Sequence, residues 1–196
     1  MGLPEILIEF KAKADTAVKR SENGIVAVIL RDDTKTGDGN LSYKYQTAAD
    51  YGLASAWNTT NRRYLNLVFA GSPKTVLVER IGADESYDDA LARLKNKKWN
   101  WLAIPSLSDD DAQDIADWII AQRSAKKSFK AVLPNCSANH EGIVNFTTDG
   151  IKCGTYSYST AEFCTRIAGL LAGLSMTESA TYQVLADVTS ITESIT

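Results

Sequence analysis

Apolar and polar residues along the chain follow two patterns, one typical of strands and one typical of helices. Apolar runs that are continuous or alternate with polar residues predict strands at residues 25–30, 75–81, 99–105, 129–133 and 142–146. Apolar residues at steps of three and four predict helices at residues 47–57, 60–70, 86–97 and 108–123, and another from residue 159 onward. Because strands and helices alternate, the sequence predicts an α/β layered sandwich with a largely parallel sheet between helices. In the strand at 99–105, Trp99 and Trp101 are expected on the same side.

The last of these helices has the most detailed pattern. One apolar face is formed at helical spacing by Phe163, Ile167, Leu170, Leu171 and Leu174. Ser159 followed by Glu162 predicts a capping box at the start of the helix. A second set of positions holds only small side chains, namely Ala168, Gly169, Ala172 and Gly173. These small residues indicate that another element approaches the helix closely.

The amino-terminal residues form a separate unit before the predicted domain. Residues 3–10 alternate, so that Ile6, Ile8 and Phe10 point to one side of a strand. Pro4 suits the beginning of a strand or a sheet edge, because it lacks a backbone donor. Residues 11–23 are mostly charged or polar without an apolar period, which is typical of a linker. This strand pairs either with its own domain or with a neighbouring chain, and the residues alone favour the first interpretation.

The free energy of such an arm is close to balance. Ordering its backbone costs about 1–2 kcal/mol per residue. Burying three large apolar side chains contributes roughly 5–9 kcal/mol, and each ladder hydrogen bond adds about 0.5–1.5 kcal/mol. A single contact of this kind is therefore marginal. It becomes effective where many subunits make the same contact at high effective concentration.

Three blocks of sequence resemble one known family. The chain contains the segment RIAGLLAGL followed by the polar SMTESATY, which is similar to contractile phage tail sheath proteins of the short Gram-positive type, also found in phage-tail-like bacteriocins. The same resemblance extends to the opening GLPEILIEFKAKADTAVKRSENGIVAVILRDD and to the middle segment KAVLPNCSANHEGIVNFTTDGI. Sheath proteins of this type continue past the point that corresponds to Asp187 into a second domain. We therefore expect an amino-terminal portion of a sheath subunit, with an arm and linker at 1–23 and the α/β sheath domain at 24–196.

The resemblance implies a structural function. Such subunits form stacked hexameric rings around an inner tube, and the sheath contracts to drive the tube through a target cell envelope. The implied partners are other copies of the chain, the inner tail tube protein and the baseplate, and assembly is expected in the bacterial cytoplasm. The implied subunit contact is β-augmentation by the arm residues Leu3, Ile6, Leu7, Ile8 and Phe10. No catalytic residue, metal or cofactor is implied.

Composition limits the other classes of function. The chain has 196 residues, a formal charge of −3 and 44% hydrophobic residues, which is typical of one soluble domain. The negative charge argues against a nucleic-acid-binding domain. No apolar run reaches the roughly 18 residues of a membrane helix, and no signal peptide is evident. Cys136, Cys153 and Cys164 lack metal-site spacing and are interpreted as buried free thiols in a reducing compartment.

Three loops contain residues that could suggest a ligand site. Residues 32–40 (DDTKTGDGN) lack the regular acidic spacing of a calcium loop. Residues 71–75 (GSPKT) follow a helix and precede a strand, the reverse of a phosphate-binding loop, so a connecting turn is expected. The three aspartates at 109–111 are explained by the favourable effect of negative charge at a helix start.

His140 is the only histidine, and Cys136, Ser137 and Glu141 lie near it in the sequence. A catalytic site would require a nucleophile and an acid positioned around this base, which sequence cannot show. A loop histidine with local hydrogen bonds is the favoured interpretation. The alternative function is a small cytosolic α/β enzyme or nucleotide-binding domain. It predicts a pocket with converging polar groups at the carboxyl ends of the strands.

Overall fold

A six-stranded sheet forms the centre of the molecule. The structure is a computed structural model that describes residues 24–34, 41–52, 57–82, 84–175 and 177–192. The strands of the sheet are β1 (Ile25–Arg31), β2 (Ser42–Tyr45), β3 (Thr75–Ile81), β4 (Trp101–Ala103), β5 (Lys130–Pro134) and β6 (Ile143–Phe146). They lie in the order β2-β3-β1-β4-β5-β6. β2 runs antiparallel to β3, and the other neighbouring pairs are parallel, which confirms the predicted sheet.

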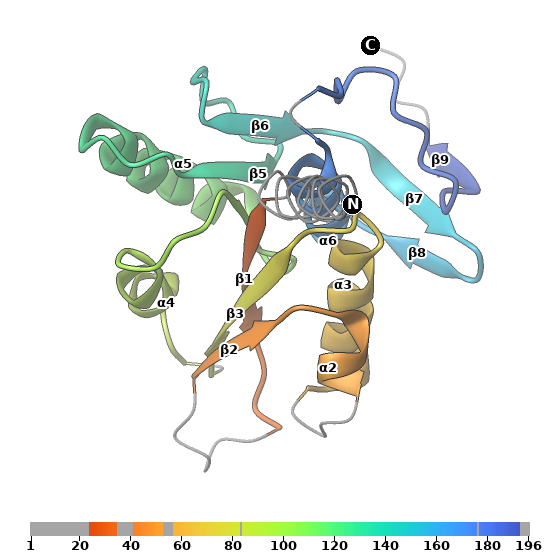
Figure 1. Cartoon of the computed structure of the whole chain (residues 1–196), viewed down its shortest axis with the longest axis horizontal. Coiled ribbons are helices and arrows are strands. Elements are labelled where there is room, and N and C mark those ends of the chain that lie inside the picture. The colour runs from red at the N-terminus through yellow and green to blue at the C-terminus, as the bar shows by residue number, and fades with distance from the viewer. Residues whose placement is uncertain (1–23, 35–40, 53–56, 83, 176, 193–196) are drawn as a thin grey trace, which may run out of the picture.

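Helices cover both faces of this sheet (Figure 1). α3 (Thr59–Phe69) and α6 (Thr160–Gly173) lie on one side, and α4 (Tyr87–Leu94) and α5 (Asp109–Ser124) lie on the other. A short helix, α2 (Ala48–Gly52), precedes α3. Alternate residues of β1 belong to different cores: Val26, Val28 and Leu30 pack in the core beneath α3 and α6, whereas Ala27 and Ile29 pack in the core beneath α4 and α5. Because both faces of β1 are buried, the strand is a continuous apolar run.

The predicted elements are found within a few residues of their expected ends, with one larger difference. The helix expected at 47–57 is described only over Ala48–Gly52, and Trp57 lies outside it. Trp57 is buried, and its indole N–H donates to the Tyr45 hydroxyl at 2.8 Å. This hydrogen bond fixes Trp57 to β2. Trp57 directly precedes Asn58, the N-cap of α3.

The prediction that Trp99 and Trp101 share one side was wrong. Trp99 lies in the core beneath α4 and α5, its ring stacks on Phe129 at 3.8 Å between centroids, and its indole N–H donates to the Leu94 carbonyl. Trp101 packs against the opposite core. The reason is that Trp99 precedes β4, so the alternation of a strand does not apply to it.

The capping box of α6 is confirmed. The Ser159 hydroxyl accepts from the Glu162 amide, and the Glu162 carboxylate accepts from the Ser159 amide. The most buried side of the helix is the small-residue side rather than the leucine face. Phe163 is buried, but Ile167, Leu170, Leu171 and Leu174 remain partly exposed.

The close approach predicted for α6 is also confirmed, and its partner is α3 with the turn after it. A Cβ built on Gly169 would lie 2.2 Å from the Val68 carbonyl oxygen, and one on Gly173 would lie 1.6 Å from that of Gly71. The two backbones therefore touch without side chains between them. This glycine crossing is possible only because these positions lack a Cβ atom.

A small second sheet was not predicted from the sequence. It contains β7 (Asp149–Cys153), β8 (Tyr156–Tyr158) and β9 (Ser190–Thr192) in the order β8-β7-β9, with antiparallel pairs. The segment before β9 is attached to α6 by an ion pair in which the Arg166 guanidinium donates to the Asp187 carboxylate at 2.8 Å. This hydrogen bond lowers the pKa of Asp187.

Candidate functional site

The predicted contact residues Leu3, Ile6, Leu7, Ile8 and Phe10 lie outside the described residues, so their role stays a prediction. The structure does locate the point at which residues 1–23 join the domain. The Gly24 amide donates to the Ala172 carbonyl at 2.6 Å, and its own carbonyl accepts from Lys74 at 3.0 Å. The joint is thus held between the end of α6 and the start of β3, at the amino ends of the parallel strands.

The carboxyl ends of the strands are where an enzyme of this topology would bind its ligand. Arg31, at the end of β1, donates to the carbonyl oxygens of Gly82 and Glu85 at 2.7 and 3.0 Å and lies 5.3 Å from the ring centroid of Tyr87. The Arg31 guanidinium at this edge therefore bonds to the fold itself. A shallow hollow of about 280 Å³ beside it is lined partly by Asp88 and Asp114.

Asp32 follows β1 and joins it to α3. Its carboxylate accepts from the Thr34 amide at 2.8 Å, from the Asn58 amide at 2.9 Å and from the Asn61 side-chain amide at 2.7 Å. Burial opposes ionisation of this group, but the hydrogen bonds outweigh burial and lower the pKa of Asp32. Among the residues that the structure describes, no group of acidic, histidine or cysteine side chains is arranged to hold a metal ion. Residues 35–40 of the acidic loop lie outside the described residues.

The histidine loop shows local contacts. The His140 Nδ1 accepts from the Gly142 amide at 3.0 Å, which is the structural interpretation favoured from the sequence. The Cys136 sulfur lies 3.8 Å from the Ala112 carbonyl oxygen, and the Ser137 hydroxyl lies 3.5 Å from Gln113. Glu141 forms an ion pair with Arg123, whose hydrogen bond lowers the pKa of Glu141. Within the described part of the chain, the sequence neighbours of His140 do not converge on it.

The turn at 71–75 is confirmed as a connection. Its first amides bond back to α3, since Gly71 donates to the Val68 carbonyl and Ser72 donates to the Phe69 carbonyl. These donors close the helix end and do not converge on an open space. Of the three free thiols, Cys136 and Cys164 are buried as predicted, whereas Cys153 is partly exposed.

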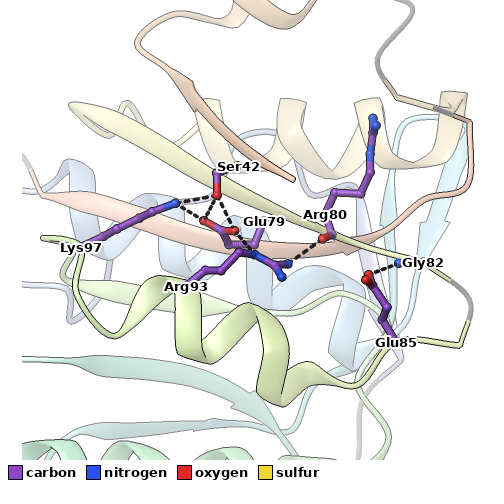
Figure 2. A network of polar contacts seen from close by, with 7 residues as sticks. All are labelled: Ser42, Glu79, Arg80, Gly82, Glu85, Arg93 and Lys97. Atoms are coloured by element: carbon purple, nitrogen blue, oxygen red, sulfur yellow. Dashed lines mark hydrogen bonds and ion pairs between the residues drawn. The ribbon is translucent and has the colours of Figure 1, made fainter. Parts of the chain in front are cut away.

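A buried ionic network was missed by the sequence analysis (Figure 2). Glu79 in β3 is fully buried, and its carboxylate accepts from Arg93 at 2.8 Å, from Lys97 at 2.5 Å and from the Ser42 hydroxyl at 2.8 Å. Figure 2 shows that these partners come from β2, from α4 and from the segment after α4. Glu79 and Arg80 are the charged pair inside the otherwise apolar strand TVLVERI, which is the signal that could have indicated the network.

The neighbouring Arg80 points to the other core. Its guanidinium carbon lies 4.6 Å from the ring centroid of Trp57 and 5.1 Å from that of Tyr43. Cation–π contacts of this kind stabilise a desolvated guanidinium. Glu79 and Arg80 together therefore attach the antiparallel edge strand β2 to the parallel sheet from both faces.

These features define a doubly covered α/β domain whose polar side chains are used for internal attachment. The family model for the central domain of phage tail sheath proteins matches residues 82–196. The chain is 33% identical over 199 residues to the tail sheath protein of Clostridium phage phiCD119, covering 97% of this chain and 54% of that protein. The chain belongs to the phage tail sheath protein family, which is structural and non-enzymatic. It spans about half the length of the curated relative.

Solved structures show the same fold at low sequence identity. A sheath tail protein from Listeria innocua matches with a TM-score of 0.75 and 16% identity, over 96% of this chain and 65% of its own. A sheath tail protein from Desulfitobacterium hafniense matches with a TM-score of 0.73 and 15% identity, over 90% and 65%. The helical sheath of the anti-feeding prophage in its contracted state matches with a TM-score of 0.54 and 14% identity, over 76% and 46%.

Proposed function

We propose that this chain is part of a contractile tail sheath subunit that polymerises as stacked hexameric rings around an inner tube, and that sheath contraction drives the tube through a target cell envelope. The observation that carries the proposal is the 33% identity to a phage tail sheath protein along 97% of the chain. The likeness to the contracted sheath of the anti-feeding prophage supports a contractile assembly. The partners are other copies of the chain, the tail tube and the baseplate, and assembly takes place in the bacterial cytoplasm.

Residues 3–10 connect one subunit to the next as an added β-strand, and residues 11–23 form the tether. One observation supports this division. The residue that follows the tether is a fixed point, because the Gly24 amide and carbonyl are both bonded to the domain. A force that a neighbouring subunit exerts through the tether would therefore act on the first residues of β1.

Electron microscopy of the complete sheath subunit tests the proposal. The unmodified protein is expected to form striated tubes or contracted cylinders. Deleting residues 1–20 is expected to abolish long polymers and to leave the far-ultraviolet circular dichroism per residue of the domain unchanged. Ordinary sheaths formed by the deleted protein would show that the arm assignment is wrong.

A matched pair of variants separates the arm contact from the loss of chain length. Ile6→Asp with Ile8→Asp places charges on the face predicted to be buried, and it is expected to prevent polymers. Glu5→Ala with Glu9→Ala changes the opposite face of the same strand, and it is expected to leave polymers intact. Equal effects of the two variants would contradict a specific β-strand contact.

A further inference from the structure

Basic side chains gather at the end of the domain where α4 and α5 finish. We name this surface the basic pole and define it by Lys95, Lys98, Lys126 and Lys127. Two adjoining hollows, each of about 420 Å³, share Lys126 and Lys127, and one of them is also lined by the Arg123–Glu141 ion pair. In the described part of the chain, no carboxylate lies within ion-pair distance of these four lysines.

Acidic side chains gather at the opposite end of the same two helices. This acidic pole is defined by Asp88, Asp89, Asp109, Asp110, Asp111 and Asp114. The hollow of about 280 Å³ lies between the first turns of α4 and α5, with Asp88, Asp111 and Asp114 in its lining. Among the described residues of that lining, the one cation is Arg31, which is already bonded to carbonyl oxygens of the fold. The chain's net charge of −3 conceals this separation.

Compensation of the helix dipole explains only part of the pattern. That effect falls off within the first and last turns of a helix. Lys98 lies beyond the end of α4, and Asp114 lies in the second turn of α5. The charges therefore extend past the residues that the dipole accounts for.

The basic pole has a rigid base. Trp99, Phe129 and Trp118 form a stack in which Phe129 lies 3.8 and 6.1 Å from the two indole centroids. The Lys127 ammonium lies 5.3 Å from the Phe129 ring centroid and donates to the Lys95 carbonyl. These contacts hold part of the charge in place before any partner arrives.

We propose that the basic pole of one copy docks on the acidic pole of another copy of this chain. Both helices connect parallel strands over the same face, so they run in the same direction and separate the poles by about 24 Å, the length of the 16-residue α5 at 1.5 Å per residue. A contact between different surfaces of identical copies is heterologous, and it continues from copy to copy as a ring or a helix. The inference rests on the proposed function and adds a contact that does not involve the arm.

A second copy fits the charges better than a nucleic acid does. Phosphates would meet the basic pole, but the acidic pole and the net charge would repel the rest of a polyanion. A second copy satisfies both poles at once, because each copy carries the complement of its own surface. Such a contact is screened by salt, since the Debye length falls from about 8 Å at 0.15 M to about 3 Å at 1 M.

A charge-swap experiment tests the contact by sedimentation of the chain at 0.05 and 1 M salt. Lys98→Glu with Lys126→Glu lowers the formal charge of the basic pole from +4 to 0, and Asp88→Lys with Asp114→Lys changes that of the acidic pole from −6 to −2. Each variant alone is expected to self-associate at least about tenfold more weakly than the unmodified chain at low salt, because one pole has lost most or all of its net charge and the attraction between the poles is reduced. An equimolar mixture of the two variants is expected to associate again, and 1 M salt is expected to abolish that recovery.

The controls separate this contact from folding and from the arm. Lys44→Glu with Lys152→Glu carries the same charge change outside the hollows and is expected to leave association unchanged. Self-association that is equal in all variants, or a mixture that fails to recover although thermal melts show folded proteins, would overturn the proposal. It would also be overturned if Lys98→Glu with Lys126→Glu abolished binding of a 30-base DNA without weakening self-association. Loss of polymers on arm deletion but not on charge reversal would leave the sheath function standing and remove the pole contact alone.

Discussion

Glu79 shows how a single buried charge fixes an edge strand. Its two carboxylate oxygens accept from Lys97, Arg93 and Ser42, and the side chain has no exposed surface. Arg93 and Lys97 are 25% and 33% exposed, so they keep partial access to water while Glu79 does not. Breaking the network would therefore leave the buried Glu79 carboxylate without partners, and it would remove the contact through which Ser42 holds β2.

Glu79→Gln is expected to lower the free energy of unfolding by about 1–3 kcal/mol, the usual effect of leaving buried polar groups unsatisfied. Urea denaturation measures this change. Glu85→Gln is the matched control, because Glu85 accepts from the nearby Gly82 amide at 2.7 Å but is only partly buried. Similar losses in the two variants would show that the network does not stabilise the fold.

Asp32 is expected to make the stability depend on pH. The pKa of Asp32 is lower in the folded state, so the unfolded state binds more protons between the two pKa values. The stabilisation is therefore complete above the unfolded pKa of about 3.9 and is lost as pH falls through the folded pKa. Asp32→Asn should be less stable than the unmodified chain at pH 7 by about 1–3 kcal/mol. The difference should shrink below pH 4 in urea titrations, and a difference that is the same at pH 7 and below pH 4 would contradict this prediction.

At the scale of elements, the glycine crossing between α3 and α6 brings two backbones into direct contact. Alanine usually stabilises a helix interior by about 1 kcal/mol relative to glycine. Here a Cβ at Gly169 or Gly173 would meet backbone oxygens at 2.2 and 1.6 Å, which cannot move as a flexible side chain does. The clash is therefore expected to outweigh the gain in helix propensity, so that alanine destabilises the domain at these positions.

Gly169→Ala and Gly173→Ala are each expected to lower the free energy of unfolding by about 3 kcal/mol or more, at the upper end of the overpacking range. Thermal melts followed by circular dichroism provide the measurement. Gly82→Ala is the control, because a Cβ there would lie 3.5 Å from its nearest neighbour, an ordinary contact. A neutral effect at Gly173 would mean that the two helices are not in backbone contact.

The sequence predicted the elements whose signals are local. The periodicity of α6, its capping box and the continuous apolar run of β1 all lie within one segment, and the structure has them at these places. β2 and β9 were missed because they are short and depend on pairing with distant partners, β3 and β7. The sequence also did not show which face of α6 is buried. Whether the leucine face or the glycine face packs inward depends on α3, the helix that crosses it. The Glu79 network could not be predicted from the sequence either, because its partners come from different elements. The arm has a local signal, the alternation of residues 3–10, and its role remains a prediction.

At the scale of the whole molecule, α6 lies at the centre, in contact with β1, β4, β5, β6 and α3 and with the small sheet. Cys164 on this helix is fully buried, and burial raises the pKa of its thiol to about 12. Because the thiolate is the reactive form, Cys164 can be alkylated only when the core opens. Cys153 is the last residue of β7, the central strand of the small sheet, and is partly exposed.

Iodoacetamide labelling at pH 8 is expected to modify Cys153 first and Cys164 only at the rate of global unfolding. Mass spectrometry of peptides across a urea series measures both rates. The Cys153 rate should change little with low urea, while the Cys164 rate should rise in parallel with the unfolded fraction. Labelling of both thiols at one rate in the absence of urea would contradict a single cooperative core around α6.

The glycine crossing also has a mechanical consequence. If α6 slid by one turn along α3, so that Thr165 took the place of Gly169, its side chain would meet the Val68 carbonyl, and this clash opposes sliding of the two helices. Tension applied at Gly24 passes through its hydrogen bond to Ala172 directly into this interlocked pair. Such a domain transmits force as a stiff link, and the displacement in a moving array has to occur in the joints between links.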